Sequence, residues 1–226
     1  MSRIKLYCLP GNDAAAHACR FLRDAQVEVV HWMEAGVTHW LAPVPTRIQP
    51  EPPDGVTLIG GNLAGAGIDL LKDPFYLAEN AAITARCAMD LIGKPLENLP
   101  VLIPGWGRIG KCLGKFLSDA GSNVTIAARN PADVAMIQAL GYGGIFLHEA
   151  AALLPRFDAV INTIPAMVLS TAGCRPDCVL LELASNPGMA GDHIIDSRGL
   201  PGKYAPEESG RLIARTILRL CREETE

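Results

Sequence analysis

The sequence predicts an α/β protein in which a doubly wound parallel sheet follows a smaller N-terminal α/β domain. Apolar strand patterns alternate with helical patterns over most of the chain, the order expected of parallel sheets. Hydrophobic residues make up 49% of the 226 positions but aromatic residues only 5%, which suits parallel strands covered by alanine-rich helices. This length allows one large domain or two unequal domains, and we expect two.

The N-terminal domain is expected over residues 1–75. Strand patterns span Ile4–Leu9, Val27–Trp32, His39–Val44 and Val56–Ile59, and a helix capped near Asp13 extends to about Ala25. The proline-rich stretch 43–53 cannot form a regular helix, and the glycine cluster at 60–67 is expected to be a mobile loop.

A long helix with one apolar side is expected over residues 74–92, ending at Gly93-Lys94-Pro95 and joining the two domains within 76–95. The larger α/β domain is expected over 96–205, with strands at 100–104, 123–128, 144–147, 158–162 and 178–183. A last helix, within 206–226, should begin after Ala205-Pro206 and extend to about Glu223.

The run from Val101 to Gly110 is the most informative stretch, because a buried strand turns directly into a patterned helix through Gly105-x-Gly107-x-x-Gly110. Such glycines permit a tight turn, close approach of a pyrophosphate and close packing of helix on strand, and the helix N-terminus favours phosphate. A glycine turn without a ligand is the alternative. The predicted cofactor-binding residues here are Gly105, Trp106, Gly107, Arg108, Ile109 and Gly110.

The end of the next strand favours NADP over NAD. An acidic residue that binds the ribose 2'-hydroxyl in NAD-binding domains would fall at Ala128. Arg129 and Asn130 follow instead, and they would suit a 2'-phosphate. The alternative is that Arg129 is an ordinary solvated arginine of a loop.

Composition excludes several other classes. A net charge of −4 with 19% charged residues leaves no basic field for nucleic acid. No signal peptide or membrane span is apparent, so a cytoplasmic protein is expected. The seven cysteines are scattered and are predicted to be reduced core thiols, and no motif predicts a metal site.

Two further polar clusters follow predicted strands. Asn162, Thr163, Ile164 and Pro165 would line the nicotinamide ribose, although an ordinary strand-to-helix turn explains them equally well. The second cluster, Glu182 to Gly188, would form a tight turn near the nicotinamide ring.

Five motifs together resemble the A subunit of dipicolinate synthase from spore-forming bacteria. They are G-W-G-R-I-G (105–110), A-A-R-N (127–130), I-N-T-I-P-A-M (161–167), L-E-L-A-S-N-P-G (181–188) and G-L-P-G-K-Y-A-P-E-E-S-G (199–210), with Ala78-Glu79-Asn80 as a further match. The resemblance covers roughly 74–226 well and the first 70 residues loosely. This chain is also shorter at its N-terminus than its relatives, and it has Gly-Met-Ala-Gly-Asp-His at 188–193 where the family usually has paired glycines and Asp-Phe.

The resemblance implies NADP-dependent oxidation of a dihydro- or hydroxytetrahydro-dipicolinate to dipicolinate, together with a flavoprotein-like B subunit. We also expect a homo-oligomer. Such a substrate is a small dicarboxylate, for which cationic side chains are suitable partners. The predicted substrate-binding residues are Ser185, Pro187, Gly188, Arg198, Lys203 and Tyr204.

Glu79 is the predicted proton acceptor, because the motif match and the start of the connecting helix both place it beside the expected substrate cleft, between the nucleotide domain and residues 1–75. Two alternatives stay open. One is another NADP-dependent reductase, such as one resembling shikimate dehydrogenase, although Lys5 and Lys72 sit in no catalytic motif. The other is a non-catalytic nucleotide-binding subunit.

Overall fold

The computed structural model describes residues 4–223 and confirms the α/β fold with two parallel sheets. The chain divides into two compact units, one formed by residues 1–83 with 201–226 and the other by 84–200. Helix α2 (Pro74–Leu91) begins in the first unit and ends in the second. No helix of the described residues is long and apolar enough to cross a membrane.

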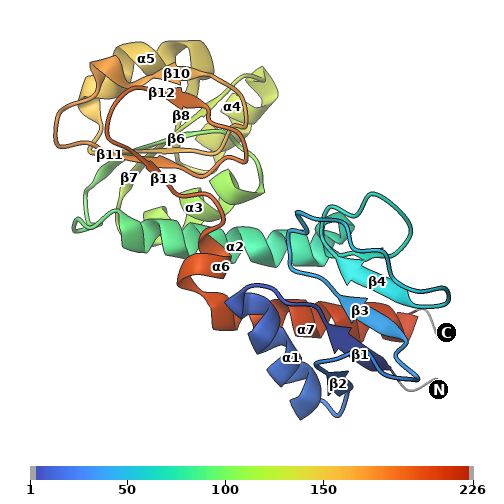
Figure 1. Ribbon diagram of the computed structural model, residues 1–226. Coiled ribbons are helices and arrows are strands. Elements are labelled where there is room, and N and C mark those ends of the chain that lie inside the picture. Colours follow the sequence, from blue (N-terminus) through green and yellow to red (C-terminus); the bar gives the residue numbers. More distant parts are fainter. Residues whose placement is uncertain (1–3, 224–226) are drawn as a thin grey trace. The chain divides into compact units, whose positions relative to one another are not determined.

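The first unit is built on a five-stranded parallel sheet of order β2-β1-β3-β4-β5 (Figure 1). Its core includes the buried side chains of Leu6, Leu41 and Ile59 on three adjacent strands. The elements are β1 (Lys5–Cys8), α1 (Asp13–Asp24), β2 (Glu28–Val30), β3 (His39–Leu41), β4 (Thr57–Gly60), β5 (Ile68–Asp69), the 3-10 turn η1 (Leu70–Lys72) and α7 (Pro206–Glu223).

The C-terminal helix α7 packs against α1 and so completes the first unit (Figure 1). Gly210 makes this close approach possible, because a Cβ at that position would lie 2.5 Å from Cβ of His17 and 2.7 Å from the carbonyl oxygen of Ala14. An ion pair of 2.9 Å between Arg20 and Glu207 joins the exposed sides of the two helices.

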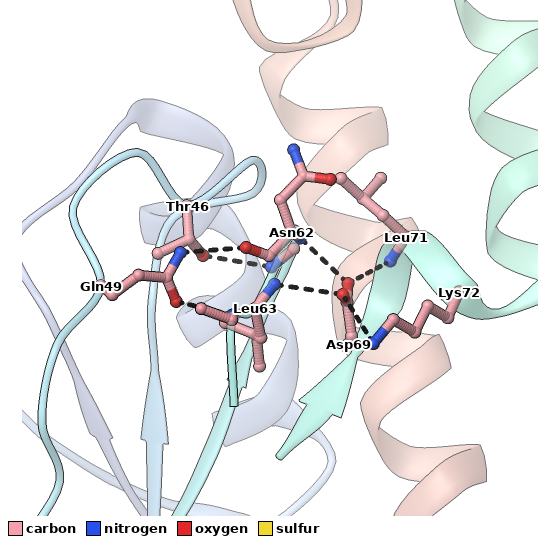
Figure 2. A network of polar contacts seen from close by, with 9 residues as sticks. Thr46, Gln49, Asn62, Leu63, Asp69, Leu71 and Lys72 are labelled. Carbon is pink, nitrogen blue, oxygen red and sulfur yellow. Dashed lines mark hydrogen bonds and ion pairs between the residues drawn. The ribbon is translucent and has the colours of Figure 1, made fainter. Parts of the chain in front are cut away.

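The glycine cluster after β4 is a loop that a polar network holds in place (Figure 2). The carboxylate of Asp69 accepts hydrogen bonds from the backbone N–H groups of Asn62 and Leu63, each at 3.1 Å, and from that of Leu71 at 3.0 Å. Gln49 donates its amide to the Asn62 carbonyl at 2.9 Å. This loop was expected to be mobile, yet its first residues are tied to two neighbouring segments.

The second unit is built on a six-stranded parallel sheet of order β13-β11-β9-β6-β7-β8. In chain order this is the 3-2-1-4-5-6 arrangement of a dinucleotide-binding fold, with the topological switch point between β6 and β9. The strands are β6 (Pro100–Pro104), β7 (Asn123–Ala128), β8 (Gly143–Phe146), β9 (Ala159–Asn162), β11 (Val179–Glu182) and β13 (Ile194–Asp196).

Helices and short turns connect these strands (Figure 1). They are α3 (Arg108–Asp119), α4 (Pro131–Ala139), η2 (Leu147–Glu149), α5 (Ala150–Leu153), η3 (Leu154–Arg156) and η4 (Thr171–Gly173), with a separate two-stranded sheet of β10 (Leu169–Ser170) and β12 (Met189–Ala190). The short helix α6 (Leu200–Tyr204) follows β13 and leads to α7. The central strand β6 is buried over Val101, Leu102 and Ile103, so its carboxyl end is held rigidly where the glycine turn begins.

Candidate dinucleotide-binding site

The glycine turn joins β6 to α3, and packing within the protein itself requires two of its three glycines. Gly105 has a φ of +110°, and a Cβ there would lie 2.2 Å from Oγ1 of Thr163. A Cβ at Gly110 would lie 2.2 Å from the carbonyl oxygen of Gly105. Neither position has room for a side chain, because the turn and α3 are in direct contact with each other and with the start of the loop that follows β9.

Gly107 differs, because the protein leaves space around it. Its φ of −80° suits any residue. A Cβ there would meet nothing within 4 Å, and the residue is exposed. Gly107 is the N-cap of α3, and no side chain caps this helix. The first N–H groups of α3 therefore adjoin an open glycine position, which fits a pyrophosphate group.

Arg129 and Asn130 lie where the sequence analysis places them, at the carboxyl end of β7. The Arg129 side chain is exposed, and within residues 4–223 no carboxylate forms an ion pair with it. Asn130 is the N-cap of α4, because its side-chain oxygen accepts a hydrogen bond of 2.9 Å from the N–H of Ala132. Ala128 is buried, so no acidic side chain occupies the position that would select NAD.

The side chains of Trp106, Arg108 and Ile109, the other residues of the turn, differ in burial and contacts. The indole of Trp106 packs edge-on against Tyr142, with ring centroids 6.1 Å apart, and the Lys111 ammonium lies 5.5 Å from the centre of the indole ring. Arg108 is exposed and Ile109 is half-buried. Trp106 therefore contributes its backbone to the turn, while its side chain packs against Lys111 of α3 and Tyr142, the residue before β8.

Asn162 and Thr163, at the end of β9, use their side chains within the protein. The buried Asn162 amide donates to Glu182 at 2.8 Å and to the carbonyl of Ile164 at 3.0 Å, and its oxygen accepts from the Ile164 N–H at 3.1 Å. The Thr163 hydroxyl donates to the Pro104 carbonyl at 2.9 Å. These contacts fix the segment that follows β9, in which Pro165 is exposed.

The sequence analysis included Glu182 in the turn after β11 but gave its side chain no role of its own. Glu182 is the last residue of β11 and is buried, with 3% of its surface exposed. Its carboxylate accepts hydrogen bonds from backbone N–H groups of the following loop. The available signal was a carboxylate at the end of an apolar strand pattern. A buried carboxylate needs several hydrogen bonds, so such a residue must organise its surroundings.

The predicted substrate-binding residues are mostly exposed. Ser185 and Pro187 lie on the surface of the loop after β11, whereas Gly188 is buried against Asn162. The Arg198 guanidinium donates through Nε to Asp196 at 2.7 Å, and this pairing raises the pKa of the guanidinium above its ordinary value. Lys203 and Tyr204 are exposed on α6 and belong to the first unit.

Glu79 lies on α2 within the first unit, where its carboxylate forms an ion pair with Arg215 of α7. Both side chains are exposed, at 49% for Glu79 and 62% for Arg215. Water screens such a pair, so Glu79 is only weakly held by it. The described residues contain no group of three or more His, Cys, Asp or Glu side chains placed to bind a metal ion.

A curated protein, the A subunit of dipicolinate synthase from Bacillus subtilis strain 168, is 31% identical to this chain over 151 residues. The chain resembles the dipicolinate synthase A subunit. The match covers 62% of this chain and 51% of the relative, so it spans about half the length of that protein. No protein-family model matches the chain.

Solved structures show the same fold. The dipicolinate synthase A subunit from Bacillus halodurans superposes with a TM-score of 0.80 at 19% identity, covering 96% of this chain and 97% of that one. A transhydrogenase from Sinorhizobium meliloti gives a TM-score of 0.70 at 14% identity, covering 98% and 95%. This chain therefore shares its α/β fold with the dipicolinate synthase A subunit over nearly its whole length.

Proposed function

We propose that this chain is an NADP-dependent dehydrogenase that oxidises a dihydro- or hydroxytetrahydro-dipicolinate to dipicolinate. The observation that carries the cofactor assignment is the contrast among the three glycines of the turn. Packing requires Gly105 and Gly110, whereas the protein leaves open space at Gly107, as expected where a pyrophosphate approaches the backbone. The substrate assignment rests on the sequence likeness to the dipicolinate synthase A subunit.

Arg129 is proposed to select NADP. Its exposed guanidinium, with no carboxylate at the end of β7, would form a charge-assisted contact with a 2'-phosphate. Asn130 supports this arrangement by capping α4 and fixing the backbone beside Arg129. An NAD-selective site would place an acidic side chain at the position of the buried Ala128.

The reaction needs little chemistry from the protein. A bound nicotinamide supplies the acceptor for a hydride, and aromatisation of the substrate ring favours the transfer. From the dihydro form, a hydride passes to the nicotinamide and the chain must orient the ring, exclude bulk water and accept one proton; the hydroxytetrahydro form must first lose a water molecule to give the dihydro form. We propose Glu79 as the proton acceptor, Ser185 and Pro187 as contacts to the substrate ring, and Arg198 with Lys203 as partners of its carboxylates.

The likeness to the A subunit of a synthase also leads us to propose a B subunit of the flavoprotein-like type as partner. The activity test includes it. The purified chain is incubated with NADP and an enzymatically generated dihydrodipicolinate precursor, with and without the B subunit, and both NADPH and dipicolinate are measured. We expect the two products in equal amounts. If NADP binds but neither NADPH nor dipicolinate forms, with or without the B subunit, a non-catalytic nucleotide-binding subunit is favoured.

A further inference from the structure

The loops after β9 and β11 are joined to each other at the carboxyl edge of the second sheet. Strands β10 and β12, one from each loop, pair in parallel. The N–H groups of Val168 and Leu169 both donate to the Gly188 carbonyl, at 2.9 and 3.2 Å. Thr171 donates its hydroxyl to the Ala190 carbonyl at 3.2 Å. The two loops therefore form one structural element.

Glu182 is the last residue of β11, where the second of the two joined loops begins. One carboxylate oxygen accepts hydrogen bonds from the Asn162 amide at 2.8 Å and the Ala184 N–H at 3.1 Å. The other accepts from the N–H groups of Gly188 at 2.8 Å and Met189 at 3.0 Å. Within the described residues no ion pair is formed with this carboxylate; the four N–H donors compensate its burial, and the Arg198 guanidinium attracts it from a longer distance.

Gly188 shows how closely the two loops approach each other. A Cβ there would lie 2.4 Å from the Asn162 amide nitrogen and 2.4 Å from the Ile164 carbonyl oxygen. Glu182 binds both sides of this contact, because it accepts from Asn162 on one loop and from Gly188 on the other. The carboxylate thus sets the spacing between the two loops.

The position of this element in the sheet indicates what it serves. Arg129 follows β7, on one side of the central strand β6, whereas β9 and β11 lie on the other side. A dinucleotide lies across the switch point, so its adenosine half belongs over β7 and its nicotinamide half over β9 and β11. We propose that Glu182 is a positioning residue for the nicotinamide half: it fixes both loops that face that half without touching the cofactor. This proposal rests on the dinucleotide-binding function proposed above.

Glu182→Gln tests the proposal with almost no change of shape. A glutamine amide replaces one acceptor by a donor, and in either orientation that donor faces two N–H groups. We expect the affinity for NADPH to fall about tenfold or more, while the affinity for 2',5'-ADP, which lacks the nicotinamide, stays within about twofold. The fluorescence change of the NADPH nicotinamide on binding should decrease as well.

Glu149→Gln is the matched control. Glu149 also accepts a backbone hydrogen bond, from the Phe146 N–H at 2.8 Å, but its side chain is exposed and it belongs to neither loop. This variant should bind both ligands like the unsubstituted protein. If Glu182→Gln does not fold, Gly188→Ala is titrated instead, because its Cβ forces the loops apart with the carboxylate intact.

The outcomes are distinct. Loss of NADPH affinity with 2',5'-ADP binding retained supports the positioning role. Unchanged binding of both ligands by the Glu182 variant, or equal weakening of both, overturns it in favour of a purely structural role. If the unsubstituted protein binds neither ligand, the proposed dinucleotide-binding function itself is wrong.

Discussion

Gly107→Val is expected to abolish NADP binding while the fold survives. Apart from Gly107 itself and its chain neighbours, no residue lies within 4 Å of the Cβ position, and the φ of −80° imposes no strain on valine. Two small effects on stability oppose each other. A non-polar N-cap is worse than glycine by up to about 1 kcal/mol, whereas loss of glycine restricts the unfolded chain and stabilises by about 0.4–1 kcal/mol. The free energy of unfolding should therefore change by less than about 1 kcal/mol.

Gly110→Ala serves as the contrasting variant in the same turn. Its Cβ would lie 2.2 Å from the carbonyl oxygen of Gly105, and a backbone atom cannot rotate away as a side chain does. Such overpacking costs about 1–3 kcal/mol, which corresponds to a fall in Tm of roughly 2–12 °C for a chain of this size. The stability cost should thus appear at position 110 and the pure binding defect at position 107.

The assay combines thermal denaturation without ligand and calorimetric titration with NADP for both variants. We expect Gly107→Val to keep the Tm within about 3 °C and to show no binding at concentrations that saturate the unsubstituted protein. Normal NADP binding by Gly107→Val would refute the reasoning, because the turn would then be a structural feature without a ligand. A Tm loss as large as that of Gly110→Ala would show that the open space at Gly107 has a packing role.

Three further predictions concern separate parts of the chain. NADP should bind at least about tenfold more tightly than NAD, and Arg129→Ala should remove most of that preference in calorimetry. Equal affinities of the unsubstituted protein for NADP and NAD would contradict the role of Arg129. Glu79→Gln should lower turnover of the dihydrodipicolinate precursor by about a hundredfold with NADP affinity unchanged. Because the ion pair between Glu79 and Arg215 is exposed, the Tm should hardly change. Turnover at the rate of the unsubstituted protein would rule out Glu79 as the proton acceptor. Burial raises the pKa of Tyr76 to about 12 from its ordinary value of 10.0. The resulting stability is complete below pH 10 and decreases as the pH rises toward 12, so denaturant titration should show a loss that Tyr76→Phe lacks; identical pH profiles would exclude this cause.

Hydrophobic patterning predicted the long elements because each buries a continuous apolar face. The strands Pro100–Pro104 and Asn123–Ala128 have the bounds expected from the sequence, and the helix Pro206–Glu223 begins at Pro206 rather than just after it. The short strands β5, β10, β12 and β13 were not predicted, because two or three residues form no detectable periodicity. Contacts from distant segments determine them, as when Leu169 pairs with Met189.

The site was predictable where function depends on the backbone and less so where it depends on side-chain direction. Glycine spacing located the turn, but only the structure distinguishes Gly107 from its two neighbours, since the distinction depends on Thr163 and on the Gly105 carbonyl. Asn162 stays a predicted contact of the nicotinamide ribose, but the sequence did not indicate that its amide contacts Glu182 at the end of the neighbouring strand β11. A pairing over 20 residues leaves no local signal in a single sequence.

A crystal structure of the chain with NADP bound tests the central claim most directly. The account predicts that the pyrophosphate lies beside Gly107 and accepts hydrogen bonds from the first N–H groups of α3, with the 2'-phosphate in contact with Arg129. A dinucleotide bound elsewhere, or an empty glycine turn at saturating NADP, would contradict the account.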